Sequence, residues 1–349
     1  MKRIFLLLIV SLLALNLVAQ DNNNKQNAGT IMFYNVENLF DTEDDPEKRD
    51  EEFTPQGDRY WSGYRYSRKL FQVYQVITAV GGWTAPDVVG LCEIENRGVL
   101  KDMINKTPLF NAGYKIIHHE SPDARGIDVG MLYREDYFTP IKNYPVPVTF
   151  PGKQRATRDI LFVQGKMRTG DTVNIFVNHW PSRWGGQMET EPKRVRAAKV
   201  LRKHVDSIFD VVNNPHIIIM GDLNDYPENR SLTKVLRAEN GGYDEPDSGK
   251  LYNLAYYLQE EEGLGSHKYQ GEWGVLDQII VSGNLLDETS PLYTDLNNVS
   301  VFNADFLLEK DEKNTGEKPY RTYIGYKYHG GYSDHLPVYL KLFKQASEK

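Results

Sequence analysis

The chain contains a single cysteine, Cys92, among its 349 residues. One thiol cannot form an intramolecular disulfide, so a small scaffold held together by disulfides is excluded. Cys92 also lies far from the N-terminus, which excludes a lipid-modified N-terminal cysteine. The fold must therefore depend on a hydrophobic core, for which an apolar fraction of 40% and 22 tyrosines supply ample material.

Positive charge is also in short supply. Lysine and arginine number 41 against 48 aspartate and glutamate, and the formal net charge is −7. Removal of an N-terminal segment that carries Lys2 and Arg3 would change this charge to −9. Such a protein lacks the many basic contacts that tight, non-specific binding of duplex DNA requires. The acidic balance is compatible with a cation held among several carboxylates.

The apolar run at the N-terminus is too short for a comfortable membrane span, because it extends only from Ile4 to Val18. A basic pair precedes the run and the small residue Ala19 follows it, which is typical of a signal peptide over residues 1–19. We therefore expect export to the periplasm or the medium, a mature chain without a transmembrane segment, and a flexible leader at 20–29.

No linker or internal repeat divides the rest of the sequence, which we expect to form one domain over residues 30–345 and to be a monomer. Apolar runs predict strands at 31–36, 87–94, 115–118, 128–133, 160–167, 172–177, 217–220, 274–282 and 336–342. Helical spacing predicts one helix over 66–80 and a longer one that begins at Pro192 and runs to Val212. Residues 41–58 indicate an acidic surface loop, with a calcium loop as the weaker alternative, and 286–328 an irregular surface excursion.

Polar side chains stand where the predicted strands end. Asp222 and Asn224 follow one apolar strand and share a face, while Leu223 between them points into packing. Glu93 stands in the apolar tail of another strand, where an ionised carboxylate must be paired or bound to a metal. Further strand ends carry Asn35, His179, Asp277, Asp334 and His335. Each alone has an ordinary structural explanation, but together they indicate a site along one rim of the fold.

The residue types along this rim favour a hard cation. Carboxylate and amide oxygens without cysteine suit Mg²⁺, Mn²⁺ or Ca²⁺ rather than structural zinc. Two histidines beside acids suggest proton transfer near neutral pH.

Six segments carry a resemblance to a known family. They are YNVENLF, GLCEIEN, VNHWPSR, MGDLND, LDQIIVSGN and YSDHLPV, in this order along the chain. The series resembles the motifs of the endonuclease/exonuclease/phosphatase superfamily, and the combination of GDxN with a terminal SDH is highly specific. The resemblance implies the DNase I-like α/β fold, a four-layered sandwich with two mixed β-sheets packed face to face, helices outside and the site at one rim.

The resemblance also implies roles around a metal ion and the attacking water. It makes Glu93 a metal ligand, with Asn35 and Asp334 nearby in the metal shell. It gives Asp222 and Asn224 the task of orienting the water and contacting the phosphate or a second metal. Asp222 therefore belongs to both the catalytic and the metal-binding groups of residues.

Histidines and arginines complete the implied site. His335 resembles the histidine at the scissile phosphate, with Asp277 as its carboxylate partner. His179 resembles the second histidine of the nuclease branch, with Glu120 as the acid paired to it. The implied phosphate-contacting residues are Arg158, Arg125, Asn224 and His179.

The expected function is that of an exported metal-dependent phosphoester hydrolase, most consistent with a phosphodiesterase of nuclease type in which water attacks in line. A phosphatase, or a phospholipid hydrolase of sphingomyelinase or inositol-phosphatase type, is the alternative. The substrate would be a nucleic acid, a nucleotide or a phospholipid headgroup, and either Asp222 or a His–Asp pair would be the general base. A non-catalytic binding module is disfavoured because every matched position keeps a competent side chain.

Overall fold

The computed structural model describes residues 25–152 and 155–345. The signal peptide predicted for 1–19 lies outside these residues. Within them, none of the helices is both long and apolar enough to cross a membrane.

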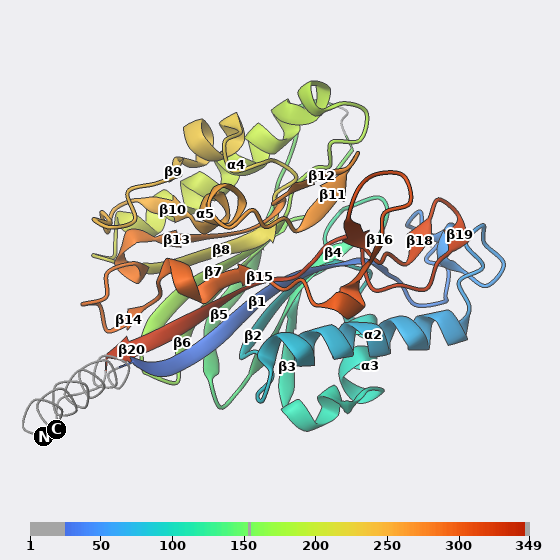
Figure 1. The fold of residues 1–349 in the computed structure, drawn as a ribbon, viewed down its shortest axis with the longest axis horizontal. Coiled ribbons are helices and arrows are strands. Elements are labelled where there is room, and N and C mark those ends of the chain that lie inside the picture. The colour runs from blue at the N-terminus through green and yellow to red at the C-terminus, as the bar shows by residue number, and fades with distance from the viewer. Residues whose placement is uncertain (1–24, 153–154, 346–349) are drawn as a thin grey trace, which may run out of the picture.

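Two seven-stranded sheets, each with parallel and antiparallel pairs, form the centre of the fold (Figure 1). The first sheet consists of β14 (Leu292–Tyr293), β20 (Val338–Gln345), β1 (Lys25–Leu39), β2 (Val88–Ile94), β4 (Asp128–Arg134) and β3 (Tyr114–His118), with β15 (Val299–Val301) also on β20. The second sheet consists of β5 (Phe138–Val146), β6 (Ile160–Met167), β7 (Thr172–His179), β8 (His216–Asp222), β13 (Asp277–Ser282), β10 (Leu251–Asn253) and β9 (Ala238–Glu239).

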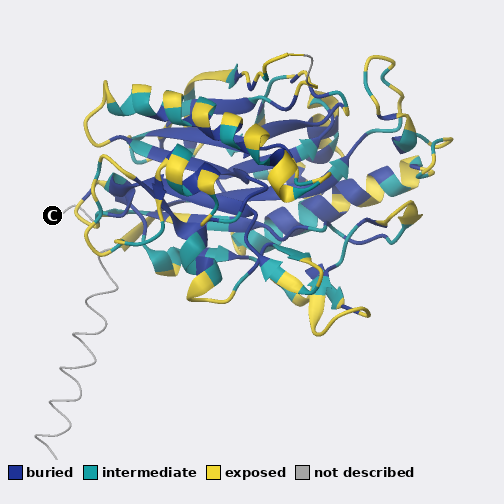
Figure 2. Ribbon diagram, turned by 90° about the horizontal axis from the view of Figure 1, so that it is seen from above, coloured by how far each residue is buried: buried dark blue, intermediate teal, exposed yellow. Residues whose placement is uncertain are grey.

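Helices cover the outer faces of both sheets, which gives the order of layers that the resemblance implies: helices, sheet, sheet, helices (Figure 1). They are α2 (Gly63–Gly81) and α3 (Arg97–Asn105) on the first sheet, and α4 (Gln187–Phe209) on the second. The short helix α5 (Leu254–Glu260) contacts β13 and β15, and its buried leucines belong to the core between the sheets. The sheets are largely buried between the helical layers (Figure 2). The predicted four-layered α/β sandwich is confirmed.

The position of β8 in the fold explains the continuous apolar run at its centre, Ile217–Met220. Ile218 and Met220 belong to the core between the two sheets. Ile217 and Ile219 point the other way, into the core under α4. A strand buried on both faces needs a continuous apolar run, and each fully buried isoleucine contributes about 1.5–3 kcal/mol through removal of its surface from water.

Most predicted strands are present, and β5 is the main one that the sequence did not predict. It contains Pro140 and Pro145 and is the edge strand of its sheet, paired only with β6. Proline cannot donate a backbone hydrogen bond, so it is tolerated in an edge strand although it weakens the sequence signal for a strand.

The predicted start of the long helix at Pro192 is wrong. Helix α4 begins at Gln187, after two glycines with positive φ, and it ends at Phe209 rather than at Val212. Pro192 lies inside the helix. Its missing N–H removes one helical hydrogen bond there, a loss that the packing of α4 on β8 outweighs.

Two predicted irregular segments are partly regular. The leader predicted at 20–29 is corrected for residues 25–29, which belong to β1 and pair with β20. The segment 286–328 contributes β14 and β15 to the first sheet and forms two hairpins of its own. These hairpins are β16 (Leu308–Lys310) with β17 (Glu317–Pro319), and β18 (Tyr323–Ile324) with β19 (Lys327–Tyr328). The segment 41–58 is a loop as predicted, with one short 3₁₀ turn at Glu51–Phe53.

A buried ion pair ties α4 to the loop after β8. The Nε atom of Arg194 lies 2.7 Å from Oδ1 of Asp225, and both side chains are almost completely buried. Arg194 also donates to the Thr190 hydroxyl and to the Gln187 carbonyl. The pair positions the chain immediately after Asn224.

We expect Arg194→Met to lower the free energy of unfolding by about 3 kcal/mol or more, because removal of one partner leaves the buried Asp225 carboxylate without its closest cation. Urea unfolding followed by circular dichroism measures the loss. Lys199→Met, on the exposed side of the same helix, is the control and should change stability by less than about 0.5 kcal/mol. Equal stability of the two variants would contradict the prediction.

Candidate active site

Three neighbouring strands of the second sheet bring polar side chains to one rim. His179 at the end of β7 lies opposite Asp222 at the end of β8. Asp222 in turn lies opposite Asp277, the first residue of β13. Strand register alone therefore places these three residues side by side on neighbouring strands.

The close approach of β7 and β8 at this rim requires glycine. A Cβ atom at Gly221 would lie 2.4 Å from the carbonyl oxygen of Asn178. Any larger residue would push apart the strand ends that carry His179 and Asp222. The glycine before Asp222 thus has a direct geometric role in the site.

The first sheet contributes Asn35 and Glu93 from the opposite side. Glu93 adopts φ +59°, a left-handed conformation that is strained for glutamate, at an irregularity in the pairing of β2 with β4. Its Oε2 atom accepts a hydrogen bond from the Asn38 amide at 3.0 Å, and its Oε1 atom lies 3.8 Å from Nε2 of His179. The strained backbone aims a carboxylate out of a buried strand and into the site.

Asp222 lies at the centre of the cluster. Its Oδ2 atom accepts from Nδ2 of Asn35 at 3.1 Å and lies 3.7 Å from Nε2 of His179 and 3.9 Å from Nε2 of His335. Its Oδ1 atom accepts from the Asn224 amide at 2.9 Å. The pKa of Asp222 is raised to about 7, chiefly by burial and also by the Asp277 carboxylate, while His335 opposes the shift. Asp222 can therefore gain or lose a proton near neutral pH.

His335 and Asp277 form a close pair. Nδ1 of His335 lies 2.6 Å from Oδ2 of Asp277, which is fully buried. Burial alone would lower the pKa of His335, but Asp277 and Asp222 outweigh it, and the pKa is raised well above the ordinary value. The His335 ring also packs against His267, with ring centroids 4.7 Å apart. His335 is therefore held in its protonated form.

His179 has the opposite electrostatic character. Burial lowers its pKa well below the ordinary value, and the positive charges of Arg158 and Arg125 lower it further. Its Nδ1 atom is buried and has no hydrogen-bond partner among the described residues. This ring is therefore neutral beside Glu93 and Asp222.

The structure does not bring Glu120 to His179, so the expected pairing of these two residues is wrong. The Glu120 side chain is 61% exposed and lies 3.8 Å from Nδ1 of His118. His118 is itself held by Asp128, at 2.9 Å. Glu120 follows the end of β3 and forms a separate cluster with His118 and Asp128.

The two predicted phosphate-contacting arginines lie on the His179 side of the rim. Arg158 is buried, and it donates hydrogen bonds to Asp123 at 3.1 Å and to the Trp180 carbonyl at 2.7 Å. Asn224, with φ +52°, donates to the same Trp180 carbonyl. Arg125 is 48% exposed and lies 3.8 Å from Asp123, so it is free to reach toward a ligand.

Four residues near the rim were not predicted. They are Glu37, Lys69, His267 and Arg321. Arg321 Nη2 lies 2.8 Å from Oδ2 of Asp334 and 3.2 Å from Oε1 of Glu37. Glu37 lies at an irregularity of β1 and has φ +51°, so regular strand alternation does not predict its direction. Arg321 lies in the irregular segment 286–328, where the sequence carries no periodic signal.

The cluster fits a hard divalent cation between the two sheets. Glu93 and Asp222 approach the same nitrogen of His179, whose neutral ring cannot balance their charge. The donors are carboxylate and amide oxygens, the ligands that Mg²⁺ and Mn²⁺ prefer. These residues, with Asn35 beside them, are the ones that could hold an ion.

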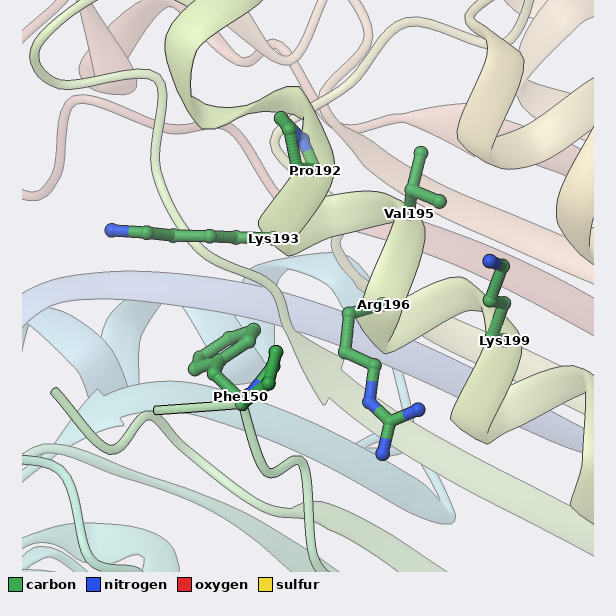
Figure 3. A pocket seen from close by; sticks show the side chains of 7 residues that line it. Phe150, Pro192, Lys193, Val195, Arg196 and Lys199 are labelled. Carbon is green, nitrogen blue, oxygen red and sulfur yellow. The ribbon is translucent and has the colours of Figure 1, made fainter. Parts of the chain in front are cut away.

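A pocket of about 260 Å³ elsewhere on the surface has no carboxylate in its lining (Figure 3). It lies between α4 and Phe150–Pro151 and is lined by Pro192, Lys193, Val195, Arg196 and Lys199. It contains none of the rim residues. The carboxylate-rich rim is therefore the candidate active site.

Two mixed sheets packed face to face, with carboxylates, an amide and a His–Asp pair along one rim, define a phosphoester hydrolase of the α/β sandwich class. The sequence matches the Endonuclease/Exonuclease/phosphatase family over residues 30–344. The chain belongs to this family, as its six motifs indicate.

Solved structures share the fold at low sequence identity. Humanized TDP2 of D. rerio is 16% identical, with a TM-score of 0.55 over 90% of this chain and 98% of that one. The human nocturnin catalytic domain with bound sulfate is 16% identical, with a TM-score of 0.54 over 92% and 96% of the two chains. A mannosyl-6-phosphatase from Bacteroides thetaiotaomicron is 17% identical, with a TM-score of 0.55 over 90% and 99%. No curated protein matches the sequence significantly.

We expect His335→Ala to lower kcat by at least about two orders of magnitude, the usual scale for a group that transfers a proton. Asp277→Asn should lower kcat in the same direction, because the carboxylate orients the ring and favours its charged form. The double variant should be little worse than His335→Ala, since residues that act as a unit are non-additive.

Initial rates and thermal melts of the three variants test this pairing, with His204→Ala on α4 as a control histidine. Multiplicative rate losses with unchanged melting temperatures would show that His335 and Asp277 act independently. An Asp277→Asn variant that unfolds, or that keeps the wild-type rate, would assign the acid a structural role only.

Proposed function

We propose that the protein is an exported, divalent-metal-dependent phosphodiesterase that cleaves its substrate by in-line attack of water. The observation that carries the proposal is the convergence of Glu93, Asp222 and the His335–Asp277 pair on one rim position. The proposed export rests on the sequence of residues 1–19 alone.

Two side chains carry out the two proton transfers of the reaction, one each. Asp222, with a pKa of about 7, accepts the proton of the attacking water. His335, held protonated by Asp277, donates a proton to the leaving oxygen. Such a donor favours a substrate whose leaving group is a basic alkoxide, as in a phosphodiester of a sugar or a glycerol.

The remaining residues bind the phosphate and the ion. Arg125 and Asn224 lie where they can contact non-bridging oxygens, and buried Arg158 adds positive charge behind them. Glu93 would hold the divalent ion, with Asn35 and Asp222 beside it. When bound, the ion supplies electrostatic stabilisation of the negative charge that develops on the phosphate.

The acidic loop 41–58 supports a small substrate. The Arg49 amide donates to the Ala124 carbonyl and Lys48 Nζ to the Ser121 carbonyl, so the loop packs against the segment that carries Arg125. Its carboxylates would repel a long polyanion near the phosphate-binding side. A nucleotide, a short oligonucleotide or a lipid headgroup suits this surface better than a long duplex, and a phosphomonoester is the second candidate.

Hydrolysis of bis-p-nitrophenyl phosphate, p-nitrophenyl phosphate, a phospholipid and a short oligonucleotide by the purified protein with Mg²⁺ tests the substrate class. We expect the diesters to be cleaved faster than p-nitrophenyl phosphate. Faster release from the monoester would replace the phosphodiesterase by a phosphatase, and cleavage of the phospholipid alone would assign the lipid headgroup.

Removal of divalent ions should abolish activity. We expect EDTA to stop hydrolysis and added Mg²⁺ or Mn²⁺ to restore it, because Glu93 and Asp222 are poised to share a cation. Glu93→Gln should require a higher metal concentration for half-maximal activity, whereas exposed Glu312→Gln should not. Full activity in EDTA would disprove metal dependence.

Binding to long duplex DNA should be weak. The net charge of −7 and the acidic loop 41–58 leave few surfaces that can neutralise many phosphates. Fluorescence anisotropy with a random duplex at about 150 mM salt measures this affinity. Tight binding with a steep salt dependence would contradict the expectation.

A further inference from the structure

One corner of the rim already contains a cation supplied by the chain. Arg321 lies between β17 and β18 and reaches back to two carboxylates of the site. Its Nε and Nη2 atoms donate to Oε1 of Glu37 at 3.2 Å each, and Nη2 also donates to Oδ2 of Asp334 at 2.8 Å. A single guanidinium therefore bridges Glu37 and Asp334, as a bound divalent ion could.

The corner is built around this charge. The Glu37 side chain is only 4% exposed, and burial without a counter-charge would be costly. The Thr322 amide donates to its Oε2 atom at 2.6 Å. Lys69, which is also buried, donates to the Thr322 hydroxyl at 2.6 Å. Adjacent residues of one segment thus deliver a cation and a backbone donor to the same carboxylate.

Without Arg321, the same corner offers donors for a metal. Ligand atoms of His267 and Asp334 lie within 4.8 Å of each other, and the neutral His267 ring can bind a metal, whereas His335 keeps its proton for Asp277. Asp334 would add a freed carboxylate oxygen and Glu37 a second carboxylate. A histidine nitrogen and carboxylate oxygens in such a group suit Mn²⁺ or Zn²⁺.

On the other side of the rim, the described part of the chain places no lysine or arginine within ion-pair distance of Glu93 or Asp222. Asp277 is paired with His335, and Arg158 is paired with Asp123. Among the described residues, the neutral His179 is the one basic side chain within ion-pair distance of Glu93, and Asp222 has His179 and the already paired His335. Arg321 and Arg158 act on Glu93 from further away. Glu93 and Asp222 therefore lack a cation in direct contact, and one divalent ion would supply it.

We propose that Arg321 is an internal cation that occupies the place of a second divalent ion at the Glu37–Asp334 corner, so that the protein binds one divalent ion per chain. The inference rests on the metal dependence in the proposed function and adds the number of ions and the residue that limits it. Asp334 thereby serves to hold Arg321 rather than to complete a two-metal site.

Mn²⁺ binding, measured by calorimetry and by the electron paramagnetic resonance of free Mn²⁺, tests the proposal without an activity assay. The wild-type protein should bind one equivalent. Arg321→Gln should bind a second equivalent, because Glu37 and Asp334 lose their shared cation. Arg321→Lys, which keeps a positive charge, should still bind one.

A companion variant keeps the test decisive if Arg321→Gln is unstable. In Glu37→Gln/Arg321→Gln the buried carboxylate and its cation are removed together, so the fold should be retained and one equivalent should bind. Thermal melts should show that Mn²⁺ raises the melting temperature of Arg321→Gln more than that of the double variant.

Each result separates this inference from the proposed function. Two equivalents in the wild type, or one in a folded Arg321→Gln variant, would overturn the role of Arg321 and leave metal-dependent hydrolysis intact. No binding by the wild type would overturn both. An increase from one to two equivalents on Arg321→Gln alone supports the inference.

Discussion

The burial of several carboxylates at one rim is the constraint on which the rest of the site depends. Asp222 and Asp277 face each other across β8 and β13, and both are removed from solvent. Like charges at such a place need nearby protons, donors or cations. The hydrogen bond from Asn35, the proton on His335 and the raised pKa of Asp222 all answer this need.

The same constraint separates the two histidines into different roles. His335 faces Asp277 and keeps its proton, whereas His179 lies near Arg158 and stays neutral. Neither state follows from the histidine itself, because both rings are buried. Burial lowers the pKa of both rings; the carboxylates reverse this effect at His335, and the arginines reinforce it at His179. A ring that donates a proton can thus lie beside a neutral ring that leaves room for a metal ion.

Local patterns predicted the parts of the site that lie on regular strands. Asp222, Asn224 and Asp277 stand where apolar runs end, and strand register then brings them together. The predicted pairing of Glu120 with His179 was wrong because it depends on the course of the connection after β3, which no periodicity in the sequence describes. Arg321 was missed for the same reason, since its approach to Asp334 is a tertiary contact made by a loop. The strand β5 escaped prediction because its prolines are acceptable only at an edge.

The first and last strands of the domain are neighbours in the sheet, and this arrangement links the site to closure of the sheet. Strand β20 pairs with β1 on one side and with β14 and β15 on the other, and His335 stands just before it. Contacts so distant in sequence carry a high entropic cost of loop closure. A chain in which β20 has not docked can already have Glu93 and Asp222 in place, yet it lacks its proton donor and exposes the edge of β1 to other chains. Docking of β20 therefore both completes the site and covers the edge of β1.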